Sequence, residues 1–162
     1  MSIIGLAYRI NNIFVKMKYK CLFGKRLSYS KFGFRKRFNV FIEKTGHITI
    51  GERCFFNNDC SLNCHNEITI GSNCVFGENV KMYDHNHKFR DKDVRIADQG
   101  FSSAPITIGN NCWIGTNVVI LKGVNIGNHV VIGAGCVIDR DIEDDSIVIC
   151  ASREITIKKM EK

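Results

Sequence analysis

Apolar residues recur every six positions over most of this chain. We count in steps of six from the isoleucine that ends each of three similar strings, HITI at 47–50, EITI at 67–70 and PITI at 105–108. The twelve positions reached are all apolar: Ile50, Phe56, Leu62, Ile70, Phe76, Met82, Ile108, Ile114, Ile120, Ile126, Ile132 and Ile138. A helix would space apolar residues by three and four, and a plain strand by two. A period of six predicts a short strand and a corner, repeated around a solenoid.

The residues that follow each apolar position support this prediction. The next residue is glycine in seven of the twelve repeats, which permits a positive φ or a close backbone approach at a corner. The residue four positions later is small or β-branched in ten repeats: Cys54, Cys60, Cys74, Val80, Cys112, Val118, Val124, Val130, Cys136 and Ile142. We therefore expect two inward-facing residues in each hexad.

The pattern apolar–Gly–x–x–small–x resembles the hexapeptide repeat of left-handed parallel β-helix acyltransferases. The resemblance covers about residues 38–150 and implies an all-β fold in which three hexads make one triangular coil. It also implies a homotrimer with a coenzyme A cleft between neighbouring coils. We accordingly expect a basic leader over residues 1–37, a β-helix domain over 38–150 and a C-terminal tail over 151–162.

The hexad register breaks between Met82 and Ile108, which are 26 positions apart. Residues 88–104 have no register and carry seven charged side chains. A loop of this length inside a compact repeat is uncommon and usually has a function. In the family that this chain resembles, such a loop leaves the coil and reaches a neighbouring subunit, so we expect one long excursion loop here.

Positive charge is concentrated in the leader. Residues 1–42 hold ten Lys and Arg and no Asp or Glu, in a chain of net charge +7 whose remainder is net negative. This distribution weakens a nucleic-acid interpretation of the main body. Apolar residues at helical spacing predict an amphipathic helix with the stripe Ile3, Leu6, Ile10, Ile13, Met17 and Cys21. Such a helix could cap the open end of the solenoid, or rest on an anionic membrane surface.

Neither a secretory signal nor an apolar run of about 20 residues is evident, so we expect a cytoplasmic protein, with attachment at the inner face of the membrane as the alternative that the leader leaves open. Eight cysteines raise the alternatives of a disulfide framework or a zinc site. Five of them occupy the small inward position of a hexad, and none forms a CxxC pair. Free cysteine packs as a small apolar residue, so we expect reduced, metal-free thiols. The hexad register does not explain Cys21, Cys64 and Cys150.

Candidate chemistry lies where the repeat fails, in the hexad 82–87, whose inward position is expected at Asn86. Its two histidines allow three interpretations: a general base, metal ligands or an anchor for the loop. The stretch resembles galactoside, maltose and streptogramin acetyltransferases, and ungapped alignment puts His87 on their catalytic histidine. His85 falls two residues short, so the resemblance gives it a supporting role.

The same resemblance assigns further residues one at a time. The backbone N–H of Thr116 is the expected donor to the oxyanion. Asn57, His65 and Trp113 are expected at the acceptor, although the family has Asp where this chain has His65. Residues expected to contact coenzyme A are Ala134, Asp139 and Arg140, of which Arg140 keeps a positive charge.

The resemblance therefore predicts a metal-free O-acetyltransferase that uses acetyl-CoA. Its acceptor would be a hydroxyl of a sugar or of a surface-polysaccharide precursor, and His87 would be the base in direct transfer. Three alternatives remain. One is a small-molecule acetyltransferase. Another is a zinc enzyme like the γ-carbonic anhydrases, for which the third histidine among His47, His65 and His129 is unclear. The last is a non-catalytic β-helix scaffold.

Overall fold

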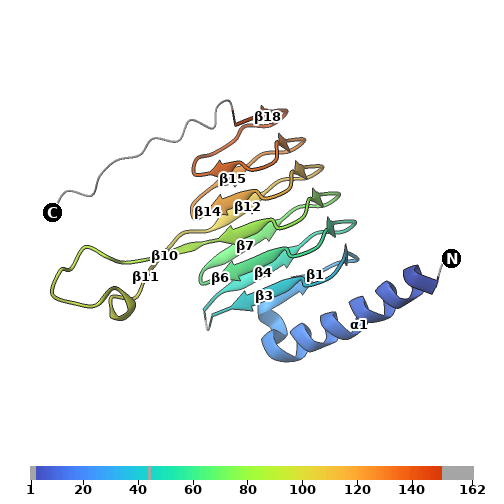
Figure 1. Ribbon diagram of the computed structural model, residues 1–162, viewed down its shortest axis with the longest axis horizontal. Coiled ribbons are helices and arrows are strands. Elements are labelled where there is room, and N and C mark those ends of the chain that lie inside the picture. The colour runs from blue at the N-terminus through green and yellow to red at the C-terminus, as the bar shows by residue number, and fades with distance from the viewer. Residues whose placement is uncertain (1–2, 44, 151–162) are drawn as a thin grey trace.

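The computed structural model describes residues 3–43 and 45–150. One long helix is followed by short strands and two single turns of 3-10 helix (Figure 1). In chain order the elements are α1 (Ile3–Phe23), η1 (Gly24–Arg26), β1 (Leu27–Tyr29), β2 (Gly33–Phe34), β3 (Asn39–Ile42), β4 (His47–Ile50), β5 (Phe55–Phe56), β6 (Ser61–Cys64), β7 (Glu67–Ile70), β8 (Val75–Phe76), β9 (Lys81–Tyr83), β10 (His85–His87), η2 (Ile96–Asp98), β11 (Phe101–Ser103), β12 (Ile106–Ile108), β13 (Trp113–Ile114), β14 (Val119–Leu121), β15 (Asn125–Ile126), β16 (Val131–Ile132), β17 (Val137–Ile138) and β18 (Ile147–Val148).

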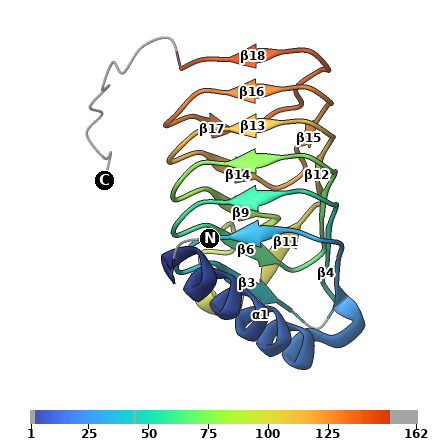
Figure 2. The same ribbon diagram turned by 90° about the vertical axis from the view of Figure 1, so that its right-hand side faces the viewer.

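The strands form three parallel sheets that make the three faces of a β-helix (Figures 1 and 2). Face 1 contains β1, β4, β7, β12 and β15; face 2 contains β2, β5, β8, β13, β16 and β18; face 3 contains β3, β6, β9, β14 and β17. The chain visits faces 1, 2 and 3 in turn, so it passes edges that we name 1–2, 2–3 and 3–1. These sheets confirm the solenoid expected from the period of six.

The core of the β-helix is built from the predicted hexad positions. All twelve apolar positions are buried, and nine of the ten small positions are buried too. The tenth, Ile142, is partly buried against the core. Equivalent residues stack from coil to coil, as Phe56 and Phe76 do with ring centroids 4.3 Å apart. One register therefore sets both the strands and the core.

The hexad glycines serve close approach between coils rather than a positive φ. A Cβ on Gly115 would lie 2.7 Å from the Ala134 nitrogen. The left-handed residues of the corners lie two positions further on, and most of them are not glycine, such as Asn111 and Asn117 with φ of 57° and 58°. Asn tolerates this conformation better than most residues.

Helix α1 caps the N-terminal end of the β-helix (Figure 2). It does so with the side that carries Asn12, Tyr19 and Lys20. The Tyr19 hydroxyl donates to the Phe38 carbonyl (2.9 Å), and the Lys20 ammonium donates to the Leu27 carbonyl (3.0 Å). The predicted apolar stripe does not face the core: Leu6, Ile10 and the other described members are exposed. Capping the free carbonyls of the first coil takes precedence, because each would otherwise lack a partner.

The excursion loop that the break in the register predicts is confirmed. Strands β10 and β11 pair antiparallel, and residues 88–100 between them project away from the body of the β-helix (Figure 1). The first coil begins at Leu27 in β1, inside the segment expected as the leader. The predicted tail over residues 151–162 lies outside the described residues. Over residues 3–43 and 45–150, no helix has both the length and the apolarity to span a bilayer.

Candidate active site

Three histidines gather on edge 3–1, where the excursion hairpin leaves the β-helix. His65 follows β6, while His85 and His87 lie on β10. The rings of His65 and His85 stack with centroids 3.7 Å apart, and Phe101 of β11 packs against both. Burial, and then the nearby charge of His85, lower the pKa of His65 below its usual value. The neutral ring of His65 is therefore favoured in the folded protein.

Asp84 organises this cluster from the inside. Its side chain is fully buried, and one carboxylate oxygen lies 3.0 Å from Nδ1 of His85. The same carboxylate accepts the backbone N–H groups of His65 (2.8 Å) and Asn66 (2.6 Å). One buried group thus fixes both the His85 ring and the corner of the preceding coil.

The inward position of this hexad was predicted wrongly. Asn86 is exposed, and Asp84 points into the β-helix instead. The register fails because β9 ends at Tyr83 and β10 turns away into the hairpin. Sequence reasoning missed Asp84. The available signal was an acidic residue directly before a histidine at the point where the repeat breaks.

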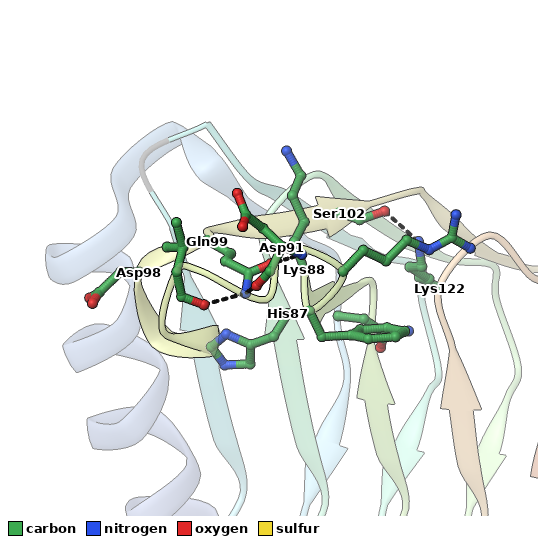
Figure 3. Close-up of a pocket in the computed structure, with 11 residues that line it drawn as sticks. His87, Lys88, Asp91, Asp98, Gln99, Ser102 and Lys122 are labelled. Atoms are coloured by element: carbon green, nitrogen blue, oxygen red, sulfur yellow. Dashed lines mark hydrogen bonds between the residues drawn. The ribbon is translucent and has the colours of Figure 1, made fainter.

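His87 stands apart from the His65–His85 stack, on the hairpin itself. Its ring packs on Phe101 with centroids 4.4 Å apart, and it is exposed to solvent. It lines a pocket of about 710 Å³ that is formed by the hairpin, with Lys122 as the lining residue from the body of the β-helix (Figure 3). Lys122 on the far side of this pocket donates to the Ser102 hydroxyl (2.6 Å). Within the described chain the His87 imidazole forms no hydrogen bond, so it can accept a proton from a bound molecule.

A second feature lies on face 2 and edge 2–3. A groove of about 410 Å³ is lined there by Trp113, Thr116 and Ala134, three residues predicted at the site, together with exposed Ile147 and Ile149. The groove is mostly apolar, and glycines 77, 115 and 133 form part of its wall. It can hold an extended, uncharged chain against the backbone.

The backbone N–H of Thr116 points to chemistry in this groove. Its neighbours are satisfied, because Gly115 N–H donates to Ile132 (2.7 Å) and Asn117 N–H donates to Glu78 (2.9 Å). The Thr116 N–H itself has no acceptor anywhere in the described residues.

On edge 2–3 the corresponding N–H groups of Asn58 and Glu78 also have no acceptor in the described residues, whereas edge 1–2 differs. There, the corresponding N–H of each coil is capped by a side chain of the next coil. Asn110 N–H donates to Asn128 Oδ1 (2.9 Å), and Asn128 N–H donates to Asp144 Oδ1 (2.7 Å). The residue of the next coil that faces Thr116 is Ala134, whose methyl group cannot accept. An uncapped N–H beside an apolar groove is a ready donor for an oxyanion.

The predicted site residues thus divide between two edges of one chain. Asn57 follows β5 on edge 2–3 with Thr116, and its amide donates to the Phe76 carbonyl (3.1 Å). His65, expected beside Asn57 at the acceptor, is instead on edge 3–1 with His87.

The predicted coenzyme A residues divide in the same way. Asp139 and Arg140 follow β17 on edge 3–1, whereas Ala134 lies on edge 2–3. Arg140 pairs with its neighbour Asp139 (Nε···Oδ1 2.8 Å), and both side chains are exposed.

Most of the cysteines are part of the packed core of the β-helix. All eight are free, and Cys54, Cys60, Cys64, Cys74, Cys112 and Cys136 are buried. Several thiols donate to carbonyls of a neighbouring coil, as Cys54 does to Gly71 (3.0 Å) and Cys60 does to Gly77 (3.2 Å). Burial raises the pKa of Cys60 to about 11 and that of Cys64 to about 12. Across residues 3–43 and 45–150, no three His, Cys, Asp or Glu side chains are grouped so as to hold a metal ion.

Comparison with known proteins agrees with this architecture. A family model described as bacterial transferase hexapeptide (six repeats) matches residues 105–140. A hexapeptide-repeat acetyltransferase from Vibrio cholerae O1 biovar El Tor, solved with acetyl coenzyme A, is 31% identical. That match covers 79% of this chain and 67% of the other, with a TM-score of 0.66. A maltose O-acetyltransferase from Clostridium difficile 630 is 35% identical over 81% of this chain and 71% of its own, with a TM-score of 0.59.

Two further structures extend the comparison. A galactoside acetyltransferase in complex with coenzyme A is 30% identical over 81% of this chain and 64% of its own, with a TM-score of 0.60. An N-acyltransferase from Bacillus cereus, at 17% identity and a TM-score of 0.57, shares the fold alone. The repeat register, the three parallel faces and the identity to the first two enzymes agree, and this chain belongs to the hexapeptide-repeat acetyltransferase family.

Proposed function

We propose that this protein is an O-acetyltransferase that moves the acetyl group of acetyl-CoA to a hydroxyl of a sugar or surface-polysaccharide precursor. The observation that carries the proposal is the uncapped Thr116 N–H in the apolar groove, faced by alanine where the coils of edge 1–2 place a capping side chain. The groove fits the extended pantetheine arm of coenzyme A. Relatives whose names record maltose and galactoside as acceptors favour a sugar.

His87 acts as the general base in this proposal. Its imidazole takes the proton of the acceptor hydroxyl while the hydroxyl oxygen bonds to the acetyl carbonyl carbon. The Thr116 N–H donates to the oxygen on which negative charge develops. The carbon–sulfur bond then breaks, and the proton on His87 passes to the departing thiolate. The products are an acetyl ester and free coenzyme A, and the enzyme forms no covalent intermediate.

The two halves of this machinery meet between copies of the chain. His87 is on edge 3–1 and Thr116 is on edge 2–3, so neither edge alone carries both. A homotrimer that sets edge 3–1 of one copy against edge 2–3 of the next would complete three equivalent sites. In that assembly Arg140 of one copy reaches coenzyme A in the groove of its neighbour. Asp84 and His85 then act as positioning residues, because they hold the base of the hairpin that carries His87.

We also place the enzyme in the cytoplasm, at a membrane surface reached through residues 1–37. The basic leader favours such a location.

The test is release of coenzyme A from acetyl-CoA by the purified protein, measured with neutral sugars and with amino sugars. We expect an acetylated product that mild base hydrolyses, because esters are labile there and amides are not. His87→Ala should lower the rate by a factor of about 10² to 10⁴. An amide product, or no transfer together with no binding of acetyl-CoA, would overturn the proposal.

A further inference from the structure

Helix α1 is held to the β-helix by one side only. On that side Asn12 Oδ1 accepts the Phe34 N–H (2.9 Å), Tyr19 donates to Phe38, and the Lys16 ammonium donates to the Phe32 carbonyl. Val15, Tyr19 and Phe23 pack against the core from the same side. The opposite side of the helix therefore plays no part in capping.

That opposite side is apolar. Its members, which we call the outward face of α1, are Leu6, Ile10, Ile13, Phe14 and Met17. They are between 46% and 64% exposed and follow one another at helical spacing. An apolar stripe of this length on the outside of a protein indicates a surface that binds a partner molecule or a membrane.

The charge of the N-terminal segment indicates which kind of partner covers this face. The first 42 residues carry ten positive and no negative side chains. A second copy of this face would bring like charges together, and that opposes self-association. Nucleic acid would satisfy the cations and leave the apolar residues in water. An anionic lipid surface satisfies both, since it offers acyl chains beneath a layer of phosphates.

A groove beside α1 adds a second, independent observation. It has a volume of about 780 Å³ and lies between the helix and the first two coils. Its apolar lining includes Ile13, which also belongs to the outward face, and Phe55 of β5. Its cations are Lys16, Lys31 and Arg53. Lys16 also donates to the Phe32 carbonyl, and Arg53 pairs with Glu52 (Nη2···Oε1 3.0 Å). Apolar walls with cationic side chains suit one phosphate group joined to a hydrocarbon chain.

We propose that the outward face of α1 docks on an anionic bilayer, and that the adjoining groove binds the phosphate and the first part of an acyl chain of one lipid. This inference rests on the proposed membrane association and not on acetyl transfer. In this orientation α1 lies between the bilayer and the first coil.

The experiment is co-sedimentation of the full-length protein with vesicles, either of phosphatidylcholine alone or of phosphatidylcholine with one quarter phosphatidylglycerol. We expect binding to the anionic vesicles that weakens with salt, and little binding to the neutral ones. Joint replacement of Phe14→Ser and Met17→Ser should reduce binding about tenfold or more. The matched control is Val137→Ser on β17, whose side chain is 59% exposed far from α1; it should bind as the wild type does.

Two charge-reversal variants, one inside the groove and one outside it, test the groove itself. Lys31→Glu should weaken binding about thirtyfold, because an attraction becomes a repulsion at the phosphate. Lys36→Glu makes the same change in the leader but outside the groove, and it should cost clearly less. Equal losses in both variants would overturn the lipid site and leave general charge attraction. No binding at low salt, or a changed oligomeric state of the Phe14→Ser, Met17→Ser variant, would overturn the membrane docking as well. Release of coenzyme A with a soluble acceptor should be normal in all four variants, which separates this inference from the proposed transfer.

Discussion

The buried Asp84 carboxylate lies 3.0 Å from Nδ1 of His85 and also accepts two backbone N–H groups of the preceding coil. The relationship joins the regular β-helix to the hairpin at the place where the excursion interrupts the repeat. It also gives the cluster on edge 3–1 a fixed geometry that an exposed loop alone would not have.

Replacing Asp84 with Asn should lower the free energy of unfolding by about 2 kcal/mol, because the amide leaves buried hydrogen-bonding groups unsatisfied. Urea denaturation measures the loss. The matched control is Asp145→Asn, which removes a carboxylate from an exposed pair with His129. It should change the free energy of unfolding by less than about 0.5 kcal/mol. Equal effects of the two substitutions would contradict the organising role of Asp84.

Replacing Ala134 with Asn should cap the Thr116 N–H, as Asn128 caps Asn110 on edge 1–2. We expect the fold to be as stable as the wild type and the rate of transfer to fall by a factor of about 10² or more. The control is Asn128→Ala, which removes a cap where no chemistry is proposed. It should cost about 1 kcal/mol of stability and leave the transfer rate within about twofold. Full activity of Ala134→Asn would show that the Thr116 N–H is not needed.

Only two thiols should react in the native protein. Cys21 and Cys150 are exposed, while the other six are buried inside the β-helix, where a reagent does not reach them. A thiol reagent that reports colour at pH 8 should therefore modify about two groups rapidly, and all eight after denaturation. Rapid modification of more than two, or fewer than eight after denaturation without reductant, would be inconsistent with this packing.

Stability should decrease at mildly acidic pH through His65. Its pKa is lowered in the folded protein, so the unfolded chain takes up the proton first as the pH falls. Above the ordinary histidine pKa of about 6.5, His65 is neutral in both states and the free energy of unfolding is undiminished. Below that pH the unfolded chain is favoured progressively, and the free energy of unfolding falls. The drop in urea midpoint from pH 7.5 to pH 5.5 should be smaller in His65→Gln than in the wild type. His129→Asn, changed at an exposed histidine on edge 1–2, controls for the loss of any histidine. Parallel pH curves for His65→Gln and the wild type would contradict this.

The repeat could be predicted from sequence because one residue in six carries its signal. Ile50, Phe76 and Ile132 are buried for the same local reason, so a period read along the chain fixes their environment. The orientation of α1 could not be predicted in this way. Its apolar stripe is visible in the sequence, but the carbonyls that draw the side with Tyr19 and Lys20 inward belong to the first coil, and only the folded end of the solenoid brings them together.

The hexad pattern could not predict the role of Asp84 or the open Thr116 N–H, for a similar reason. The hexad register extrapolates to Asn86, and it has no means of anticipating that the chain turns out at Tyr83. The importance of Ala134 emerges only from comparison with Asn128, which occupies the matching place on another edge and caps an N–H there. Resemblance to the family named Thr116, Ala134 and Trp113, which line one groove, and His87, which lies on a different edge.

We propose that each active site combines His87 of one copy with the groove of another. The most direct measurement is the activity of mixed trimers, made by co-expressing His87→Ala and Ala134→Asn chains with different tags. Each variant alone should be nearly inactive. A one-to-one mixture should recover roughly a quarter of the wild-type activity, because one in four random pairings joins an intact base to an intact groove. A mixture as inactive as its two components, or His87→Ala chains that transfer acetyl groups by themselves, would contradict the claim.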